Sequence, residues 1–209
     1  MSTLLQSMTH TRIIAIVRLE NYDRAQEVAE ALIAGGISVI EFTLTGKGAV
    51  TAIARTHEAL GEAALIGAGT VLTVNDVQDV VSAGAQFVVT PVLNHAVIAA
   101  CHRSNVPIVC GALTPTELQS AYEAGAELLK VFPARQFGPQ YIRDLLAPLP
   151  HLRLVPTGGV SPQNAAAYIK AGAIAVAMGG NLVSEQAVAS GDWMQITRQA
   201  QECIQAVQM

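Results

Sequence analysis

The chain has 209 residues, which suits one large domain, so we expect a single domain over residues 1–209. Hydrophobic residues make up 51% of the chain and charged residues only 13%, a composition that excludes intrinsic disorder and is typical of tightly packed enzymes. The net charge of -4, with arginines scattered along the chain, leaves no basic stripe. We therefore expect a small-molecule partner and no nucleic acid.

Cysteine and histidine usage argues against metal sites and disulfide bonds. Cys101, Cys110 and Cys203 are an odd, widely spaced set without a Cys-x-x-Cys pair, and the five histidines are equally scattered, so we expect no metal. Residues 1–12 lack the apolar segment of a signal peptide, and no apolar run approaches the roughly 18 residues that span a bilayer. We expect a cytoplasmic protein without a membrane partner.

Strand-like and helical segments alternate along the whole chain. Apolar runs typical of buried strands cover Ile13–Val17, Ser38–Leu44, Ala64–Ala68, Gln86–Thr90, Pro107–Cys110, Glu127–Phe132, Leu152–Pro156 and Ile174–Met178. Helical patterns lie between them over Asp23–Ala34, Val50–Leu60, Val74–Ala83, Asn94–Ser104, Thr116–Ala124, Gln140–Leu146 and Pro162–Ala171. The alternation predicts parallel strands joined by crossover helices.

A short motif recurs at the ends of four of these helices. Ala34-Gly-Gly-Ile, Ala83-Gly-Ala-Gln, Ala124-Gly-Ala-Glu and Ala171-Gly-Ala-Ile stand more than forty residues apart. The glycine suits the left-handed residue that ends a helix, and the interval matches two β–α units. Four double units predict a closed (β/α)8 barrel, the TIM-barrel fold, with an open doubly wound sheet as the alternative.

Further signals mark helix ends. Thr114 before Pro115 and Ser161 before Pro162 predict capped helix starts. The segment Asp192–Gln208 carries apolar residues at helical spacing, and we expect this last helix to pack across the barrel.

Lys130 stands in the apolar run Glu127-Leu-Leu-Lys-Val-Phe-Pro133, which otherwise predicts a buried strand. An ammonium group is unfavourable in such surroundings unless it is paired or neutral. Period-two alternation points Lys130 into the barrel from the sixth strand and Glu41 from the second. Two interpretations remain open: a structural ion pair, or a nucleophilic amine with a carboxyl group as its proton shuttle.

Glycine-rich turns follow the last two strands. Gly158 and Gly159 follow the seventh strand, and Gly179, Gly180 and Asn181 follow the eighth. Barrels commonly hold a phosphate at this place, on backbone N–H groups that glycine leaves accessible. Tight turns without a ligand are the alternative.

Other candidate site residues end the first, third and fourth strands. Thr70, in the loop Gly67-Ala-Gly-Thr, either contacts a substrate carboxylate or carbonyl or caps the next helix. Pro91 would stiffen the wall beside the site. Arg18 is either an anion binder or a surface residue.

Four motifs in their order point to one family: Glu41-Phe-Thr-Leu44, Gly67-Ala-Gly-Thr-Val71, Leu129-Lys-Val-Phe-Pro133 and Pro156-Thr-Gly-Gly-Val160. They closely resemble the motifs of the 2-keto-3-deoxy-6-phosphogluconate (KDPG) / 4-hydroxy-2-oxoglutarate (KHG) aldolases, over nearly the whole chain. The resemblance implies a class I aldolase, a carbon–carbon lyase that forms a Schiff base, on a (β/α)8 barrel. It also implies a homotrimer that needs no metal or cofactor and takes a phosphorylated keto sugar acid.

The resemblance also implies residue roles. Lys130 corresponds to the Schiff-base lysine and Glu41 to the general acid and base. The substrate-binding positions are Thr70 and Thr157 at the pyruvyl portion, Pro91 and Phe132 as pocket walls, and Gly158, Gly159, Gly179 and Gly180 at the phosphate.

Two positions depart from the family pattern. Thr45 stands where many relatives have Arg or Asn, and Asn181 stands where gluconate-type enzymes have Ser. We expect both to contact substrate, with Arg18 or Lys47 supplying the charge that Thr45 lacks. The segment Phe137-Gly-Pro-Gln-Tyr141 is similar to that of the related 6-phosphogalactonate aldolases. The galactonate epimer is therefore the alternative substrate, and a phosphate-binding isomerase or epimerase is the more remote alternative.

Overall fold

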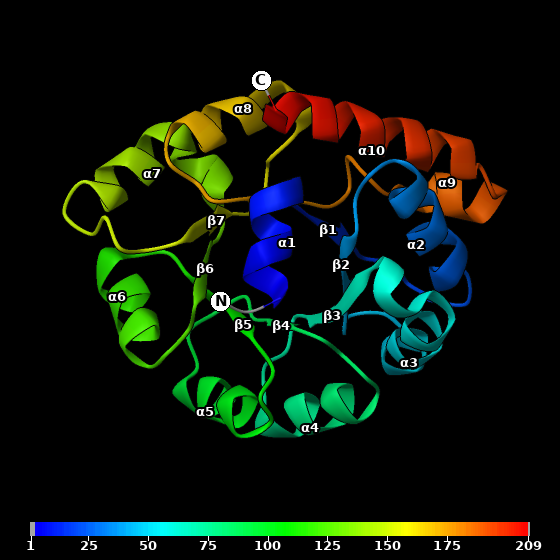
Figure 1. Ribbon diagram of the computed structural model, residues 1–209, viewed down its shortest axis with the longest axis horizontal. Helices are drawn as coiled ribbons and strands as arrows, with labels where there is room; N and C mark the ends of the chain where they lie inside the picture. Colours follow the sequence, from blue (N-terminus) through cyan, green and yellow to red (C-terminus); the bar gives the residue numbers. More distant parts are fainter. Residues whose placement is uncertain (1–2, 209) are drawn as a thin grey trace.

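A computed structural model describes residues 3–208, and its parallel strands form an almost closed barrel (Figure 1). The strands are β1 (Ile13–Val17), β2 (Val39–Thr43), β3 (Leu65–Gly69), β4 (Val88–Val89), β5 (Ile108–Ala112), β6 (Leu128–Val131), β7 (Leu154–Pro156) and β8 (Val176–Met178). From β1 to β7 consecutive strands are hydrogen-bonded neighbours, and β8 pairs with β1. The expected (β/α)8 barrel is confirmed, and the open doubly wound alternative is wrong.

The ring is weakest between β7 and β8. A single bridge between Thr157 and Ala177 joins them there, together with a hydrogen bond of 3.1 Å from the Ile174 N–H to the Leu154 carbonyl. Both strands are shorter than the sequence predicts, because their first residues leave the regular ladder. The barrel is therefore least regular beside the two glycine turns.

Helices cover the outside of the barrel. They are α2 (Ala25–Ala34), α3 (Ala49–Leu60), α4 (Val74–Ser82), α5 (His95–Arg103), α6 (Pro115–Glu123), α7 (Gly138–Leu146), α8 (Pro162–Lys170), α9 (Glu185–Ser190) and α10 (Trp193–Gln208), with the short 3-10 turns η1 (Gly61–Ala63) and η2 (Ala134–Gln136). Thr114 and Ser161 stand at the N-cap positions of α6 and α8 with Pro at the first helical position, as expected. None of the helices within residues 3–208 is both long enough and apolar enough to cross a bilayer.

The recurring Ala-Gly motif has a single structural cause. One glycine of each repeat, Gly36, Gly84, Gly125 and Gly172, follows the helix with φ between 87° and 106°. Only glycine adopts this region without steric cost, so the chain can leave the helix and enter the next strand.

Side-chain alternation separates two hydrophobic clusters. On β2 the side chains of Ile40 and Phe42 pack toward the helices, while Val39 joins the barrel interior. On β6 Leu129 and Val131 face outward and Leu128 faces inward. The expected orientation of these two strands is confirmed, and it places Glu41 and Lys130 one step above the inward apolar layer.

A first helix, α1 (Thr3–Thr11), closes the other end of the barrel and was not expected from the sequence. Leu4, Leu5 and Met8 are buried in the inner cluster beside Val39 and Leu128, and Figure 1 shows α1 across the middle of the ring. Because β1 begins just after α1, this plug lies at the N-terminal ends of the strands. The opposite end stays free for a site.

The last helix, α10, does not pack across the barrel, and that expectation was wrong. It lies beside α2 and α8 in the outer layer (Figure 1). The Thr197 hydroxyl donates a hydrogen bond of 3.0 Å to the Ala31 carbonyl, and Gly35 leaves room for Ala200. The apolar stripe of α10 therefore completes the ring of helices, and α1 performs the closing role.

Candidate active site

Glu41 and Lys130 both lie inside the barrel near the C-terminal ends of their strands. Their exposed fractions are 1% and 5%. Glu41 is in register with Gly67 of β3, and Lys130 is in register with Gly111 of β5. The space that the missing side chains leave is filled from the next strand, by the Phe87 ring beside Gly67 and by the backbone of Thr90 and Pro91 beside Gly111.

Glu41 has an unusual environment for a carboxyl group. Neither carboxylate oxygen has a hydrogen-bond partner among residues 3–208. Burial raises the pKa of Glu41, and the positive charges of Lys130 and then Arg18 act in the opposite direction. Within the described residues the Glu41–Lys130 pair makes no contact ion pair, so the carboxyl oxygens remain available to another group.

Lys130 opens onto the main cavity, which has a volume of about 710 Å³. The lysine nitrogen lies 5.3 Å from the centre of the Phe132 ring, a distance suited to a cation–π contact. The cavity brings together these residues expected at the site: Arg18, Lys130, Phe132, Thr157, Gly158, Gly159, Gly179, Gly180 and Asn181. They come from the ends of β1, β6, β7 and β8.

The turn after β7 requires glycine at both positions. Gly158 and Gly159 have φ values of 87° and 86°. A Cβ atom on Gly158 would lie 3.1 Å from the Phe132 ring, and one on Gly159 would lie 2.5 Å from Arg135 Cβ. The turn therefore packs its backbone directly against the segment that follows Lys130.

The turn after β8 is built differently. The Leu182 and Val183 N–H groups donate to the Gly179 carbonyl at 2.7 and 3.1 Å, which folds Gly180 and Asn181 outward as exposed residues of the cavity rim. A Cβ atom on Gly180 would meet nothing within 4 Å. This turn leaves open space where the turn after β7 is tightly packed.

Three expected residues lie elsewhere on the mouth of the barrel. Thr45, Thr70 and Pro91 follow β2, β3 and β4 and do not line the main cavity within the described part of the chain. Glu41, buried on β2, does not line this cavity either. Thr70 has a left-handed backbone with φ of 60°, and Thr73, not Thr70, caps α4. The exposed Thr45 hydroxyl is 2.9 Å from the buried Thr43 hydroxyl.

The sequence did not single out two charged residues of the cavity, Arg135 and Glu185. Both follow strands that carry site residues, Arg135 in η2 after β6 and Glu185 at the start of α9 after β8. Their position in the sequence, just beyond strands that carry site residues, could have indicated that Arg135 and Glu185 line the cavity.

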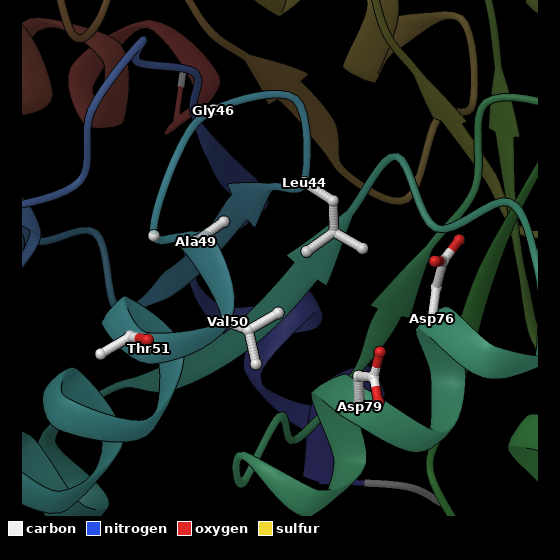
Figure 2. Close-up of a pocket in the computed structure, with 8 residues that line it drawn as sticks. Leu44, Gly46, Ala49, Val50, Thr51, Asp76 and Asp79 are labelled. Atoms are coloured by element: carbon white, nitrogen blue, oxygen red, sulfur yellow. The ribbon is translucent and has the colours of Figure 1, made fainter.

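A second cavity, shown in Figure 2, has a volume of about 290 Å³ and lies between the start of α3 and α4. Leu44 and Val50 face Asp76 and Asp79 across it. Asp76 already accepts hydrogen bonds of 2.9 Å from the Leu72 and Thr73 N–H groups in the cap of α4. Its carboxylate is thus engaged in capping the start of α4, and the expected site residues lie outside this cavity.

Comparison with known proteins places the chain in a family. Residues 4–199 match the family model of KDPG and KHG aldolase. The 2-dehydro-3-deoxy-phosphogluconate aldolase of Treponema pallidum (strain Nichols) is 38% identical over 208 residues, 99% of each chain. The 2-dehydro-3-deoxy-6-phosphogalactonate aldolase of Escherichia coli (strain K12) is 37% identical over 179 residues, 85% of this chain and 87% of that one.

A solved structure has the same barrel. The KDPG aldolase of Legionella pneumophila, with pyruvate captured as a covalent carbinolamine, superposes with a TM-score of 0.87 at 29% identity, covering 96% of this chain and 97% of that one. Together with the match to the family model over most of its length, this likeness shows that the chain belongs to the KDPG and KHG aldolase family.

Proposed function

We propose that this protein is a class I aldolase that cleaves 2-keto-3-deoxy-6-phosphogluconate to pyruvate and glyceraldehyde 3-phosphate. The observation that carries the proposal is the pair of buried groups, Lys130 and Glu41, inside the barrel. Lys130 is 5% exposed and opens onto the cavity, and the Glu41 carboxyl group is buried with no hydrogen-bond partner among residues 3–208. A structural ion pair would have joined these two groups directly.

Schiff-base formation comes first. The neutral amine of Lys130 attacks the C2 ketone, whose π electrons move onto the oxygen, and proton transfer gives a carbinolamine. Glu41 donates a proton to the leaving hydroxyl group, water departs, and the nitrogen lone pair forms the C=N bond. Because burial raises the pKa of Glu41, its carboxyl group gives up and takes back protons closer to neutral pH than an exposed carboxyl group does.

Carbon–carbon cleavage follows. Glu41, now ionised, removes the proton of the C4 hydroxyl group, directly or through a water molecule. The C4–O bond becomes a carbonyl, the C3–C4 bond breaks, and its electrons form an enamine with the protonated imine as acceptor. Glyceraldehyde 3-phosphate leaves, the enamine is protonated at C3, and hydrolysis of the imine releases pyruvate and regenerates Lys130.

The rest of the cavity suits the remainder of the substrate. Phe132 directly follows β6, which carries Lys130, and Thr157 directly follows the neighbouring strand β7. Both line the cavity and are the proposed contacts of the pyruvyl portion, together with Thr70 and Pro91 after β3 and β4. The glycine turns after β7 and β8 are the proposed phosphate site, because backbone N–H groups there can approach an anion.

The stereochemistry at C4 is the least constrained part of the substrate assignment. Thr45 and Asn181 are both exposed at the mouth, and the E. coli galactonate-type enzyme is nearly as similar in sequence as the T. pallidum gluconate-type enzyme. Pyruvate release should therefore be measured with both phosphorylated epimers and with unphosphorylated 4-hydroxy-2-oxoglutarate. Faster cleavage of the gluconate epimer supports the proposal, and faster cleavage of the galactonate epimer supports the alternative substrate. If none of the three compounds releases pyruvate, both assignments are contradicted.

We also propose that the chain works as a homotrimer in the cytoplasm, where phosphorylated sugar acids are retained. Exposed apolar side chains support self-association: Leu72 after β3 and Val92 after β4 are 46% and 52% exposed. The two loops are joined by a hydrogen bond of 3.1 Å from Asn94 Nδ2 to the Leu72 carbonyl. Light scattering coupled to size-exclusion chromatography measures the number of chains.

A further inference from the structure

Arg135 is a cation on the wall of the main cavity that the mechanism above does not use. Its side chain is exposed, and within residues 3–208 it has no ion-pair partner. The same cavity contains the two glycine turns after β7 and β8. A guanidinium group so placed is free to bind a ligand anion.

The backbone fixes Arg135 against the turn after β7. Its N–H donates a hydrogen bond of 2.9 Å to the Gly158 carbonyl, and the neighbouring Ala134 N–H donates one of 2.8 Å to the Thr157 carbonyl. A Cβ atom on Gly159 would lie 2.5 Å from Arg135 Cβ and 3.5 Å from Arg135 Nε. The side chain of Arg135 therefore leaves the backbone alongside Gly159, in the space that the missing side chain provides.

Arg135 and Arg18 act at different parts of the cavity. The charge of Arg18 acts on Glu41 and opposes the rise in its pKa caused by burial, whereas Arg135 lies against Gly158 and Gly159 of the turn after β7. Arg18 thus belongs to the end where bonds are made and broken, and Arg135 belongs to the end with the glycine turns. The two ends match a substrate with a carboxylate near the reacting carbons and a phosphate at the far end.

We propose that Arg135 binds the phosphate group of the substrate and sets the preference of this enzyme for phosphorylated over unphosphorylated keto acids. This inference rests on the proposed aldolase function and adds a side-chain cation to a subsite otherwise made of backbone. The planar guanidinium group donates two parallel hydrogen bonds to phosphate oxygens, which backbone N–H groups in a turn cannot reproduce.

Glu185 explains why such a cation is needed. It is the acidic residue that lines the same cavity, at the start of α9, and it is exposed. A phosphate dianion bound near Glu185 is repelled, and the positive charge of Arg135 offsets that repulsion. Removing the Glu185 charge should therefore tighten phosphate binding.

The kinetic test compares Arg135→Gln with Arg143→Gln, an exposed arginine on α7 outside the cavity. With the phosphorylated substrate, Arg135→Gln should raise KM by about 10- to 50-fold, the loss expected for a charge-assisted hydrogen bond. Its kcat, and its KM for 4-hydroxy-2-oxoglutarate, should stay within about twofold of wild type, and Arg143→Gln should change neither KM. Glu185→Gln should lower KM for the phosphorylated substrate only. Equal changes for both substrates, or no change in Arg135→Gln, would overturn the assignment.

A binding measurement separates this assignment from the aldolase function. Inorganic phosphate should raise the Tm of wild type and of Arg143→Gln, because a ligand that binds only the folded state stabilises it. The shift should be largely lost in Arg135→Gln. An undiminished shift in Arg135→Gln contradicts the proposal whether or not the protein cleaves any keto acid, whereas failure of the aldolase proposal appears as wild-type protein that releases no pyruvate.

Discussion

Gly69 lies directly against the carboxyl group of Glu41. A Cβ atom on Gly69 would overlap Glu41 Oε1 and crowd its Cδ and Cγ atoms. The last residue of β3 thus has no side chain where the carboxyl group of Glu41 on β2 occupies that space. Glu41 is held beneath the mouth by the shape of its neighbours, since hydrogen bonds to its oxygens are absent within residues 3–208.

Gly69→Ala should displace Glu41 and lower kcat by about 100-fold, because small errors in the position of a catalytic group have large effects on rate. The free energy of unfolding should also fall by about 1–3 kcal/mol from overpacking. Steady-state kinetics and urea unfolding measure both. The double variant Gly69→Ala/Glu41→Gln provides the control: if Gly69 acts through Glu41, the double variant should be hardly slower than Glu41→Gln alone. Fully additive losses would show that Gly69 acts elsewhere.

Glu41→Gln should reduce kcat by about 10²- to 10⁴-fold, the usual contribution of a positioned acid/base group. The same substitution should raise thermal stability at neutral pH. Burial raises the pKa of Glu41 above its ordinary value of 4.5, so ionisation opposes folding once the pH exceeds that value. Below it, both folded and unfolded chains carry a neutral carboxyl group and the effect vanishes.

The pH dependence gives the check. The Tm of Glu41→Gln should exceed that of wild type by about 2–8 °C at pH 7.5, for a difference of about 1–2 kcal/mol. The difference should shrink toward zero near pH 4. A Tm difference that grows as the pH falls would mean that Glu41 stabilises the folded chain as an anion.

Thr70→Gly tests two properties of Thr70: the strain of its left-handed backbone and the contact of its hydroxyl group with substrate. A β-branched residue with φ of 60° is strained by about 1–3 kcal/mol, so glycine should raise the free energy of unfolding by about 1 kcal/mol after its own entropy is counted. Loss of the hydroxyl group should raise KM if Thr70 contacts the pyruvyl portion. Asn105→Gly is the matched control, because Asn105 has φ of 55° but lies after α5, and asparagine tolerates this conformation. Increased stability without any change in KM would remove Thr70 from the site.

Leu72→Asp should shift the protein toward monomers, because it places a charge on the proposed contact surface beside Val92. Light scattering at micromolar concentration measures the molar mass. Met194→Asp is the comparison, since Met194 is 63% exposed on α10, away from that surface. If both variants keep the mass of wild type, the contact surface lies elsewhere.

The barrel and the pair of inward charges could be predicted from the sequence because both depend on local periodicity. Alternation on β2 and β6 is strict enough to turn the one charged residue of each strand, Glu41 and Lys130, away from the outward apolar face. The glycine turns were predictable because φ above zero restricts the residue type.

Other features depended on contacts that no local pattern encodes. Among the described side chains of α1, Leu4, Leu5 and Met8 mark the buried face, too few to predict a helix that closes the barrel. The sequence of α10 would show the same apolar stripe whether the helix packed across the barrel or within the ring of helices. Arg135 is an exposed charge in a short turn, and only the three-dimensional approach of Gly159 reveals its place at the cavity.

The most direct test of the account is reduction of the protein with borohydride in the presence of pyruvate, followed by peptide mass spectrometry. The chain has only three lysines, Lys47, Lys130 and Lys170, so the site of modification is read without ambiguity. The account predicts an adduct on Lys130 alone, its absence without pyruvate, and its loss in Lys130→Met. An active preparation that leaves Lys130 unmodified, or that carries the adduct on Lys47 or Lys170, would contradict it.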